Sequence, residues 1–178
     1  SLLYIKKYLT MTNKKSIPET YIPKSLTAKD KAQQCKNLRK SRRLYKQMRY
    51  YKRPKVKSFK NKKSVHLTNA KRIYGIEKLE IAKELSDKTQ CTIEGLEQIV
   101  NKGRGAYYSS GSRPNQTADS WGIARLASAI TGGKASIVDY HILNEHCKPK
   151  SKAIKLANKT CRKEKKCKKY LNKTKRKN

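Results

Sequence analysis

The stretch KGRGAYYSSGSRPNQTADSWGIARLASAITGGKASIVDYHIL, residues 102–143, differs in composition from the chain on either side of it. It is rich in glycine and alanine, contains the only tryptophan, Trp121, and comes close to charge balance. Its flanks are crowded with lysine and arginine. Because a near-neutral stretch can collapse and bury apolar surface, residues 102–143 are predicted to form the centre of the folded domain.

Charge divides the 178 residues into three segments. The chain has 46 Lys and Arg against 12 Asp and Glu, a formal net charge of +34. Residues 1–68 carry +19, residues 69–145 carry +1 and residues 146–178 carry +14. A compact unit with a large charge of one sign repels itself. We therefore predict a basic N-terminal arm with one long helix (1–68), a helical core domain (69–145) and a lysine-rich C-terminal tail (146–178), with both arms partly extended.

Local signals predict a mainly α-helical fold with a small central bundle of short helices. Thr27 followed by Asp30 is typical of a helix start, and the helix that follows is expected to run from about residue 28 to 50. Thr68, Thr92, Thr117 and Ser136 are expected to cap the later helices. The predicted core helices span residues 69–74, 78–89, 93–102 (ended by Gly103), 118–131 and 137–143.

The helix over residues 118–131 is apolar nearly all round, which predicts that it is buried. Its neighbour over residues 93–102 has an apolar face at helical spacing. The residues expected to pack in the core are Leu96, Ile99, Trp121, Leu126 and Ile130.

The glycine-rich loop GRGAYYSSGSRP, residues 103–114, invites a phosphate-binding interpretation. It matches neither GxxxxGK[ST] nor GxGxxG between a strand and a helix, so glycines that set helix ends and turns are the favoured interpretation. Ser109, Ser110, Ser112 and Ser120 have only His141 as a nearby base, and no motif forms an oxyanion hole. We expect no catalytic residues, no cofactor and no enzymatic activity.

Five cysteines show neither the density nor the spacing of a disulfide framework. A zinc site from His146, Cys147, Cys161 and Cys167 is disfavoured, because the chain has no CxxC pair. No apolar run reaches the roughly 18 residues that a membrane span requires. The first residues place Leu2, Ile5 and Leu9 at helical spacing, which predicts a short segment that packs on a neighbour, with a membrane-surface anchor less favoured.

Aromatic and basic side chains interleave between residues 39 and 59, a composition that suits a binding surface. They could stack on nucleic-acid bases, or they could serve as anchors against a protein. The helix–turn–helix outline over residues 78–102 is acidic on its second helix, at Glu94 and Glu97, which argues against insertion into a DNA groove. The candidate partner-binding residues are Arg39, Arg42, Arg43, Tyr45, Arg49, Tyr50, Tyr51, Arg53 and Phe59.

Two blocks of the sequence, YIPKSLTAKDKAQQCKNLRKSRRLYKQMRYYKRPKVKSFKNKKS (21–64) and residues 103–143, resemble a family of basic proteins from large DNA viruses, with relatives in chlorella viruses and mimiviruses. The resemblance implies a viral origin and a place in the virion, and it brings no catalytic residues. On this basis we expect a minor capsid protein on the inner side of the shell, which cements major and other minor capsid proteins through its basic arms. The alternative is a nonspecific nucleic-acid-binding protein of the virion interior, or a ribosome-like RNA binder.

Overall fold

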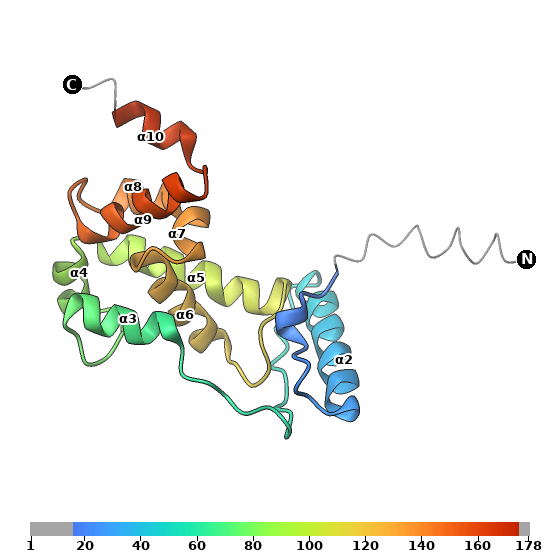
Figure 1. The fold of residues 1–178 in the computed structure, drawn as a ribbon. Coiled ribbons are helices and arrows are strands. Elements are labelled where there is room, and N and C mark those ends of the chain that lie inside the picture. Colours follow the sequence, from blue (N-terminus) through green and yellow to red (C-terminus); the bar gives the residue numbers. More distant parts are fainter. Residues whose placement is uncertain (1–15, 175–178) are drawn as a thin grey trace, which may run out of the picture.

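The computed structural model describes residues 16–174 of the chain, with side chains described through Leu171. This part of the chain is α-helical and contains no strand, which confirms the predicted fold class (Figure 1). The amphipathic segment expected around Leu2, Ile5 and Leu9 lies outside the described residues. The elements are the 3-10 helix η1 (Glu19–Tyr21) and the α-helices α2 (Ala28–Tyr45), α3 (Val65–Tyr74), α4 (Lys83–Thr89), α5 (Ile93–Ser109), α6 (Ala118–Ile130), α7 (Lys134–Val138), α8 (Tyr140–His146), α9 (Lys152–Lys163) and α10 (Lys168–Thr174).

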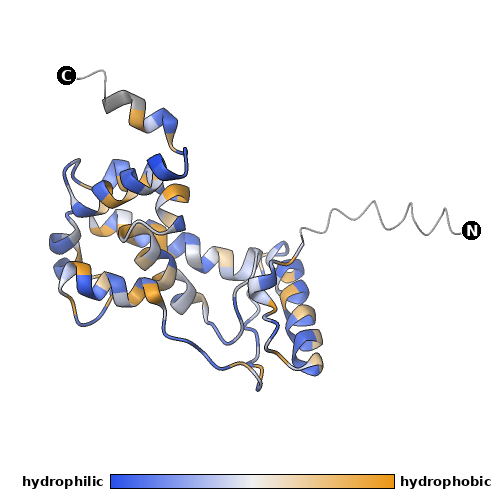
Figure 2. Ribbon diagram, in the orientation of Figure 1, coloured by the Kyte–Doolittle hydropathy of each residue, from blue (hydrophilic) through white to orange (hydrophobic). Residues whose placement is uncertain are grey.

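Helices α5 and α6 form the centre of the molecule, and α3, α7, α8 and α9 pack around them (Figure 1). The backbones of α5 and α6 cross closely at two glycines. A methyl group on Gly103 would lie 2.6 Å from the Cα atom of Gly122, so neither position has room for a side chain. In Figure 2 hydrophobic and hydrophilic residues alternate along these helices, as expected for elements that bury one face.

Several helix starts lie where the sequence predicts them. The side chains of Thr27, Thr92 and Thr117 each accept a hydrogen bond from a backbone N–H three residues later. Each threonine thereby satisfies a donor that the first helical turn leaves without an internal partner.

Other predicted boundaries are wrong, for identifiable reasons. Helix α3 is capped by Ser64 rather than Thr68, and α2 ends at Tyr45 rather than near residue 50. Helix α4 begins only at Lys83. Helix α5 does not end at Gly103 but continues to Ser109, because this glycine serves the close crossing with α6.

The last predicted helix, residues 137–143, is two short helices, α7 and α8. Asp139 lies between them and is fully buried. Its carboxylate accepts hydrogen bonds from the Arg125 guanidinium at 2.7 and 2.8 Å, and the Lys102 ammonium lies 3.2 Å away. One carboxylate therefore connects the α7–α8 junction to both α5 and α6.

The packed core extends past residue 145. Helix α9 buries one face, formed by Ala153, Ile154, Ala157 and Cys161, in the same cluster as the core residues of α5 and α6. At the other end of the chain, α2 and the segment after it pack against the end of α5 through hydrogen bonds to the Tyr107 and Tyr108 carbonyls. The described parts of both basic segments thus contact the core domain.

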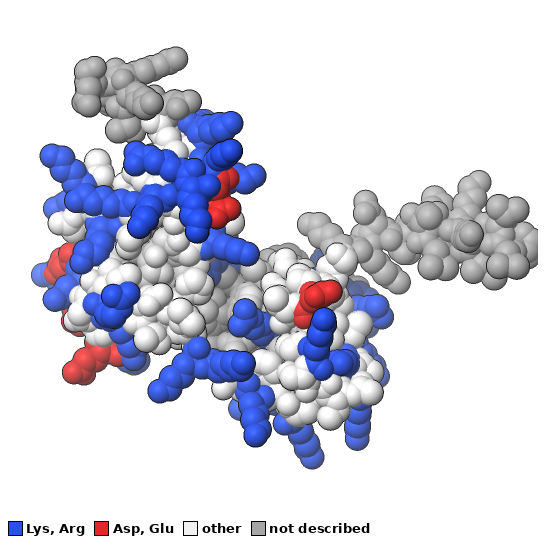
Figure 3. All heavy atoms as spheres, in the orientation of Figure 1, with Lys and Arg blue, Asp and Glu red and all other residues white. Residues whose placement is uncertain are grey.

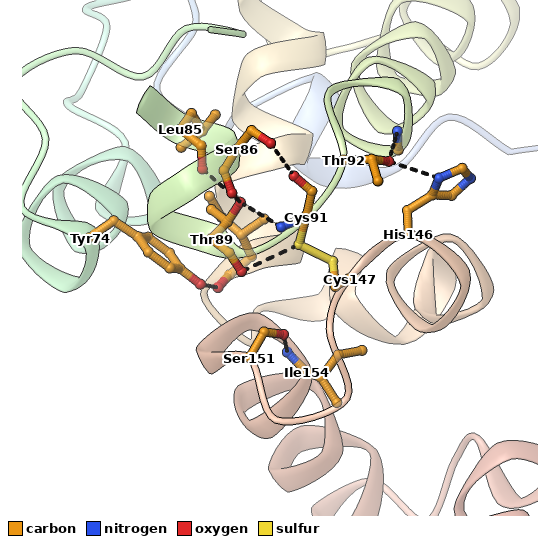
Figure 4. The surroundings of a disulfide bond; sticks show 12 residues. Tyr74, Leu85, Ser86, Thr89, Cys91, Thr92, His146, Cys147, Ser151 and Ile154 are labelled. Carbon is orange, nitrogen blue, oxygen red and sulfur yellow. Dashed lines mark hydrogen bonds between the residues drawn. A yellow bond between two sulfur atoms is a disulfide. The ribbon is translucent and has the colours of Figure 1, made fainter. Parts of the chain in front are cut away.

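Two disulfides join cysteines for which the sequence spacing predicts no framework, so that prediction is wrong. Cys91, just before α5, pairs with Cys147, just after α8, across 56 residues (Figure 4). Cys161, near the end of α9, pairs with Cys167, just before α10. Because the first pair is brought together only by the packing of α5 against α8, its spacing in the sequence holds no signal. In the part of the chain that the structure describes, no helix is long and apolar enough to cross a membrane.

Candidate partner-binding surface

An open groove of about 1330 Å³ lies between α2, the segment that leads into η1, and the end of α5. Apolar side chains contribute to its lining from both sides, among them Ile17, Pro18 and Tyr21 before α2 and Ala32 and Cys35 on α2. Ser109 and Ser110 contribute from the end of α5.

Five of the six cationic side chains that line the groove come from α2, and the sixth, Lys46, follows it directly. No carboxylate is among the described residues that line the groove. The groove is therefore positive and partly apolar, and its charge is complementary to an acidic partner. The six cations are Lys36, Arg39, Lys40, Arg42, Arg43 and Lys46.

Helix α2 is fixed in place at both ends. At its start, the Asp30 carboxylate accepts hydrogen bonds from the backbone N–H of Ser58 at 2.7 Å and from the Ser58 hydroxyl at 2.6 Å. These hydrogen bonds hold the pKa of Asp30 below its ordinary value. Near its end, the Arg42 guanidinium donates to the carbonyl of Ser110 at 2.9 Å, which joins the groove wall to the end of α5.

Arg53, a candidate partner-binding residue, is instead part of the interior. Its side chain is 8% exposed and lies over the Tyr107 ring, 3.7 Å from the centroid. Its guanidinium donates to the Ser41 hydroxyl, the Tyr107 carbonyl and the Ser112 hydroxyl at 2.6–2.9 Å. Desolvation by burial lowers the pKa of this guanidinium. The prediction that Arg53 contacts a partner is therefore wrong.

Six of the other eight candidates fall into two groups. Arg39, Arg42 and Arg43 line the groove. Tyr45 and Tyr50 form an aromatic cluster with Tyr108 beside the end of α2, in which Tyr50 stays 65% exposed and Arg49 is also exposed.

Two further candidates are half-buried and engaged within the chain. The Tyr51 ring lies 4.4 Å from the Lys40 ammonium, and its hydroxyl donates to Asn37. The backbone carbonyl of Phe59 accepts a hydrogen bond from Asn115.

Four of the five expected core residues, Leu96, Ile99, Leu126 and Ile130, are at most 1% exposed. Trp121 is different, because it is only half-buried and stands outside the core cluster. Its ring meets the edge of Tyr21 at a centroid distance of 5.9 Å, so it links α6 to η1.

Two of the four candidate serines have structural roles. Ser112 is buried and accepts from Arg53, and Ser120 completes the cap of α6. His141 is exposed on α8. Among the described residues, no group of three His, Cys, Asp or Glu side chains is placed to hold a metal ion.

Sequence reasoning missed the groove itself and the buried ion pair of Asp139. Both depend on contacts between residues far apart in the chain, such as Arg42 with Ser110 and Arg125 with Asp139. Ser136 followed by Asp139 predicts a helix start. Nothing in this local pattern distinguishes a carboxylate exposed near a helix start from a buried one.

Comparison with known proteins places the chain in one family. The model of a family of unknown function (DUF5824) matches residues 18–142, well over half of the chain, so the chain belongs to that family. The matched part includes the whole of α2 and all six groove cations. No curated protein and no solved structure matches the chain.

Proposed function

We propose that this member of the family is a non-enzymatic structural protein that binds acidic protein surfaces, and that it serves as a minor capsid protein on the inner side of the shell of a large DNA virus. The observation that supports this function best is the α2 groove, whose described lining combines apolar side chains with six cations and no carboxylate.

The chemistry of the groove favours a protein partner. Arginine, tyrosine and methionine are enriched where proteins meet, whereas lysine is depleted there. Three of the six groove cations are arginines. Tyr50, in the aromatic cluster, and Met48, two residues before it, add two exposed side chains of the enriched types. An acidic segment with apolar side chains can satisfy both parts of such a surface, whereas a phosphate backbone offers nothing to the apolar part.

A structural role is favoured over a catalytic one because the polar groups near the groove are used by the fold. The Ser110 carbonyl accepts a hydrogen bond from Arg42, and the Ser112 hydroxyl accepts one from Arg53. The Asp30 carboxylate accepts a hydrogen bond from the backbone N–H of Ser58. A nucleophile needs a base within hydrogen-bond reach, and the described lining of the groove offers neither a histidine nor a carboxylate.

The capsid assignment is supported by the resemblance of residues 21–64 and 103–143 to basic proteins of large DNA viruses. A protein that cements shell units contacts them at many equivalent positions, and a basic protein is suited to shell surfaces that are acidic. A net charge of +34 gives electrostatic attraction to such surfaces, and the rigid α2 groove gives a defined register.

Fractionation of virus particles tests the proposal. Particles are opened gently, genome-free shells are separated from nucleoprotein cores, and the protein is quantified in each by mass spectrometry. We expect it with the shells at a fixed ratio to the major capsid protein. Recovery only with the nucleoprotein cores would overturn the capsid function and would favour nucleic-acid binding in the virion interior.

A pair of variants tests whether the groove is responsible. Arg39→Glu/Arg43→Glu reverses two groove cations, and Lys71→Glu/Arg72→Glu reverses two exposed cations on α3, with the same change in net charge. We expect the groove variant to be lost from shells and the α3 variant to be retained. Equal retention of both would show that the groove does not hold the protein to the shell.

A further inference from the structure

We infer that the exposed face of α9 is a second binding surface, separate from the α2 groove, and that it takes the phosphate backbone of a nucleic-acid duplex. This inference is independent of the capsid function, because it concerns a different helix and a different class of partner.

Helix α9 has two chemically distinct faces. Ala153, Ile154, Ala157 and Cys161 are buried against the core. The basic residues lie on the opposite side of the helix, within an arc of about 100°, and all are exposed. They are Lys152, whose ammonium donates to the Ile73 carbonyl of α3 at 3.1 Å, and Lys155, Lys159, Arg162 and Lys163.

The spacing of these cations suits a repeating anion. Residues three and four apart on a helix place their side chains about 5–6 Å from each other. At a rise of about 1.5 Å per residue, the row from Lys155 to Lys163 is about 12 Å long. Because the phosphates of a B-form strand wind around the duplex while each advances about 3.4 Å along the axis, a straight row of this length contacts the few phosphates that face it.

The positive charge of this face is not neutralised within the described chain. None of Lys155, Lys159 and Lys163 forms an ion pair with a carboxylate among the residues that the structure describes. The exposed lysines after the helix, such as Lys166 and Lys169, extend the same charge toward α10. Figure 3 shows Lys and Arg side chains, in blue, gathered over the end of the molecule that contains α9, with Asp or Glu side chains, in red, beside them.

The helix is held against the core, so the backbone positions that carry its cations are fixed before a partner binds. Ser151 caps its first turn, and the Thr160 hydroxyl donates to the carbonyl of Gly132 at 2.7 Å. The side chain of Asn158 accepts a hydrogen bond from the Tyr140 hydroxyl. A preorganised row of charges binds with less ordering cost than the same charges on a flexible segment.

The composition of the face distinguishes a phosphate backbone from a protein surface. Four of its five cations are lysines, which are depleted at protein interfaces and act as point charges toward phosphates. The exposed face of α9 also has no aromatic side chain, so it offers no platform on which unpaired bases could stack. A duplex, read through its backbone alone, therefore fits better than a single strand.

The α9 face and the α2 groove lie at opposite ends of the molecule, with α5 and α6 between them (Figure 1). A partner on one surface leaves the other accessible. The protein is therefore able to bridge an acidic protein surface to a nucleic acid.

Salt-dependent binding of a 30-base-pair DNA duplex, followed by fluorescence anisotropy, tests the inference. The variant Lys155→Gln/Lys159→Gln/Lys163→Gln removes three α9 cations, and Arg39→Gln/Lys40→Gln/Arg43→Gln removes three groove cations with the same change in net charge. Each phosphate contact contributes about 0.9 to the slope of log K against log salt concentration. We expect the α9 variant to lose about 2–3 from this slope, and the groove variant to lose less than about 1.

Equal losses in the two variants would mean that net charge alone attracts the DNA, and the inference would fail. It would also fail if the α9 variant kept the slope of the native chain. Circular dichroism at the start of each titration confirms that both variants are folded. Vesicles that contain anionic lipid serve as a competing probe, and loss of vesicle binding without loss of duplex binding would assign the α9 face to a membrane surface instead.

Discussion

At the scale of single residues, Arg53 is a cation that serves the fold rather than a partner. Its guanidinium stacks on Tyr107 and donates to three oxygens, and no carboxylate accepts from it among the described residues. Removing the side chain leaves the buried Tyr107 carbonyl without this donor. We expect Arg53→Ala to lower the free energy of unfolding by about 2–3 kcal/mol, measured by urea denaturation.

Arg43→Ala is the control, because Arg43 is exposed on α2, the helix before the segment that contains Arg53, and its loss should change stability by less than about 0.5 kcal/mol. Arg53→Lys keeps the charge but loses the planar stack and the forked hydrogen bonds, so it should not restore the native value. Equal stability of the Arg53 and Arg43 variants would contradict the buried role of Arg53.

Two aspartates provide a second test, because one ion pair is buried and the other is exposed. Asp139 is fully buried between Arg125 and Lys102, whereas the side chain of Asp119, paired with Arg104 at 2.7 Å, is 78% exposed. Removing the carboxylate of a buried pair leaves the cation without a partner, whereas at an exposed pair water replaces the lost contact. Thermal and urea unfolding should show a loss of about 3 kcal/mol for Asp139→Asn and less than about 1 kcal/mol for Asp119→Asn. Similar losses for the two would mean that the interior position of Asp139 has no energetic weight.

The contact between Asp30 and Ser58 gives a pH-dependent prediction. The two hydrogen bonds from Ser58 favour the charged carboxylate and hold the pKa of Asp30 below 3.8. The stability from this contact is therefore present above about pH 4 and is lost as the pH falls through the folded-state pKa. Ser58→Ala should raise the pKa of Asp30 toward 3.8 in an NMR titration, and Ser64→Ala, at the cap of α3, should leave it unchanged. An unchanged Asp30 pKa in the Ser58 variant would show that the contact is absent in solution.

At the scale of elements, the crossing of α5 and α6 depends on the absence of a side chain at Gly103. An alanine methyl there would lie 2.6 Å from the Cα atom of Gly122 and would push the helices apart. Gly105, two residues later in the same helix, has no neighbour nearer than 3.7 Å to such a methyl. We expect Gly103→Ala to destabilise the protein by about 1–3 kcal/mol and Gly105→Ala to stabilise it by about 0.5–1 kcal/mol. Effects of the same sign, measured by chemical unfolding, would contradict this packing.

The starts and ends of the helices show how much of the fold the sequence predicts. The caps at Thr27, Thr92 and Thr117 follow from local chemistry, because a side-chain oxygen reaches a backbone N–H only three residues away. The end of α5 does not follow, because the role of Gly103 depends on Gly122 in another helix. The pairing of Cys91 with Cys147 is hidden for the same reason.

The candidate site shows a similar limit. The sequence identifies the basic character of α2, and Arg39, Arg42 and Arg43 do line the groove. It does not show that Arg53, only a few residues after α2, turns inward, because that depends on Tyr107 and Ser112. Local composition therefore predicts that a region binds, and tertiary contacts decide which of its side chains are exposed to do so.

At the scale of the whole molecule, a core made chiefly of α3 to α9 holds two basic surfaces apart. Disulfides and buried ion pairs stabilise this core, whereas the cations of α2 and α9 face outward. A chain with a net charge of +34 stays folded because most of this charge is at the surface, where water and counterions screen it. The arrangement suits a protein that joins partners and remains unchanged itself.

Cross-linking of intact virus particles with a carbodiimide, which joins amines directly to carboxylates, tests whether the α2 groove binds acidic shell proteins. Lys36, Lys40 and Lys46 line the groove, and Lys62 and Lys63, in the exposed segment before α3, are the internal reference. We expect mass spectrometry to find the groove lysines joined to Asp and Glu of shell proteins more often than the reference lysines. Groove lysines without cross-links to any shell protein, in particles where the reference lysines do react, would contradict this expectation.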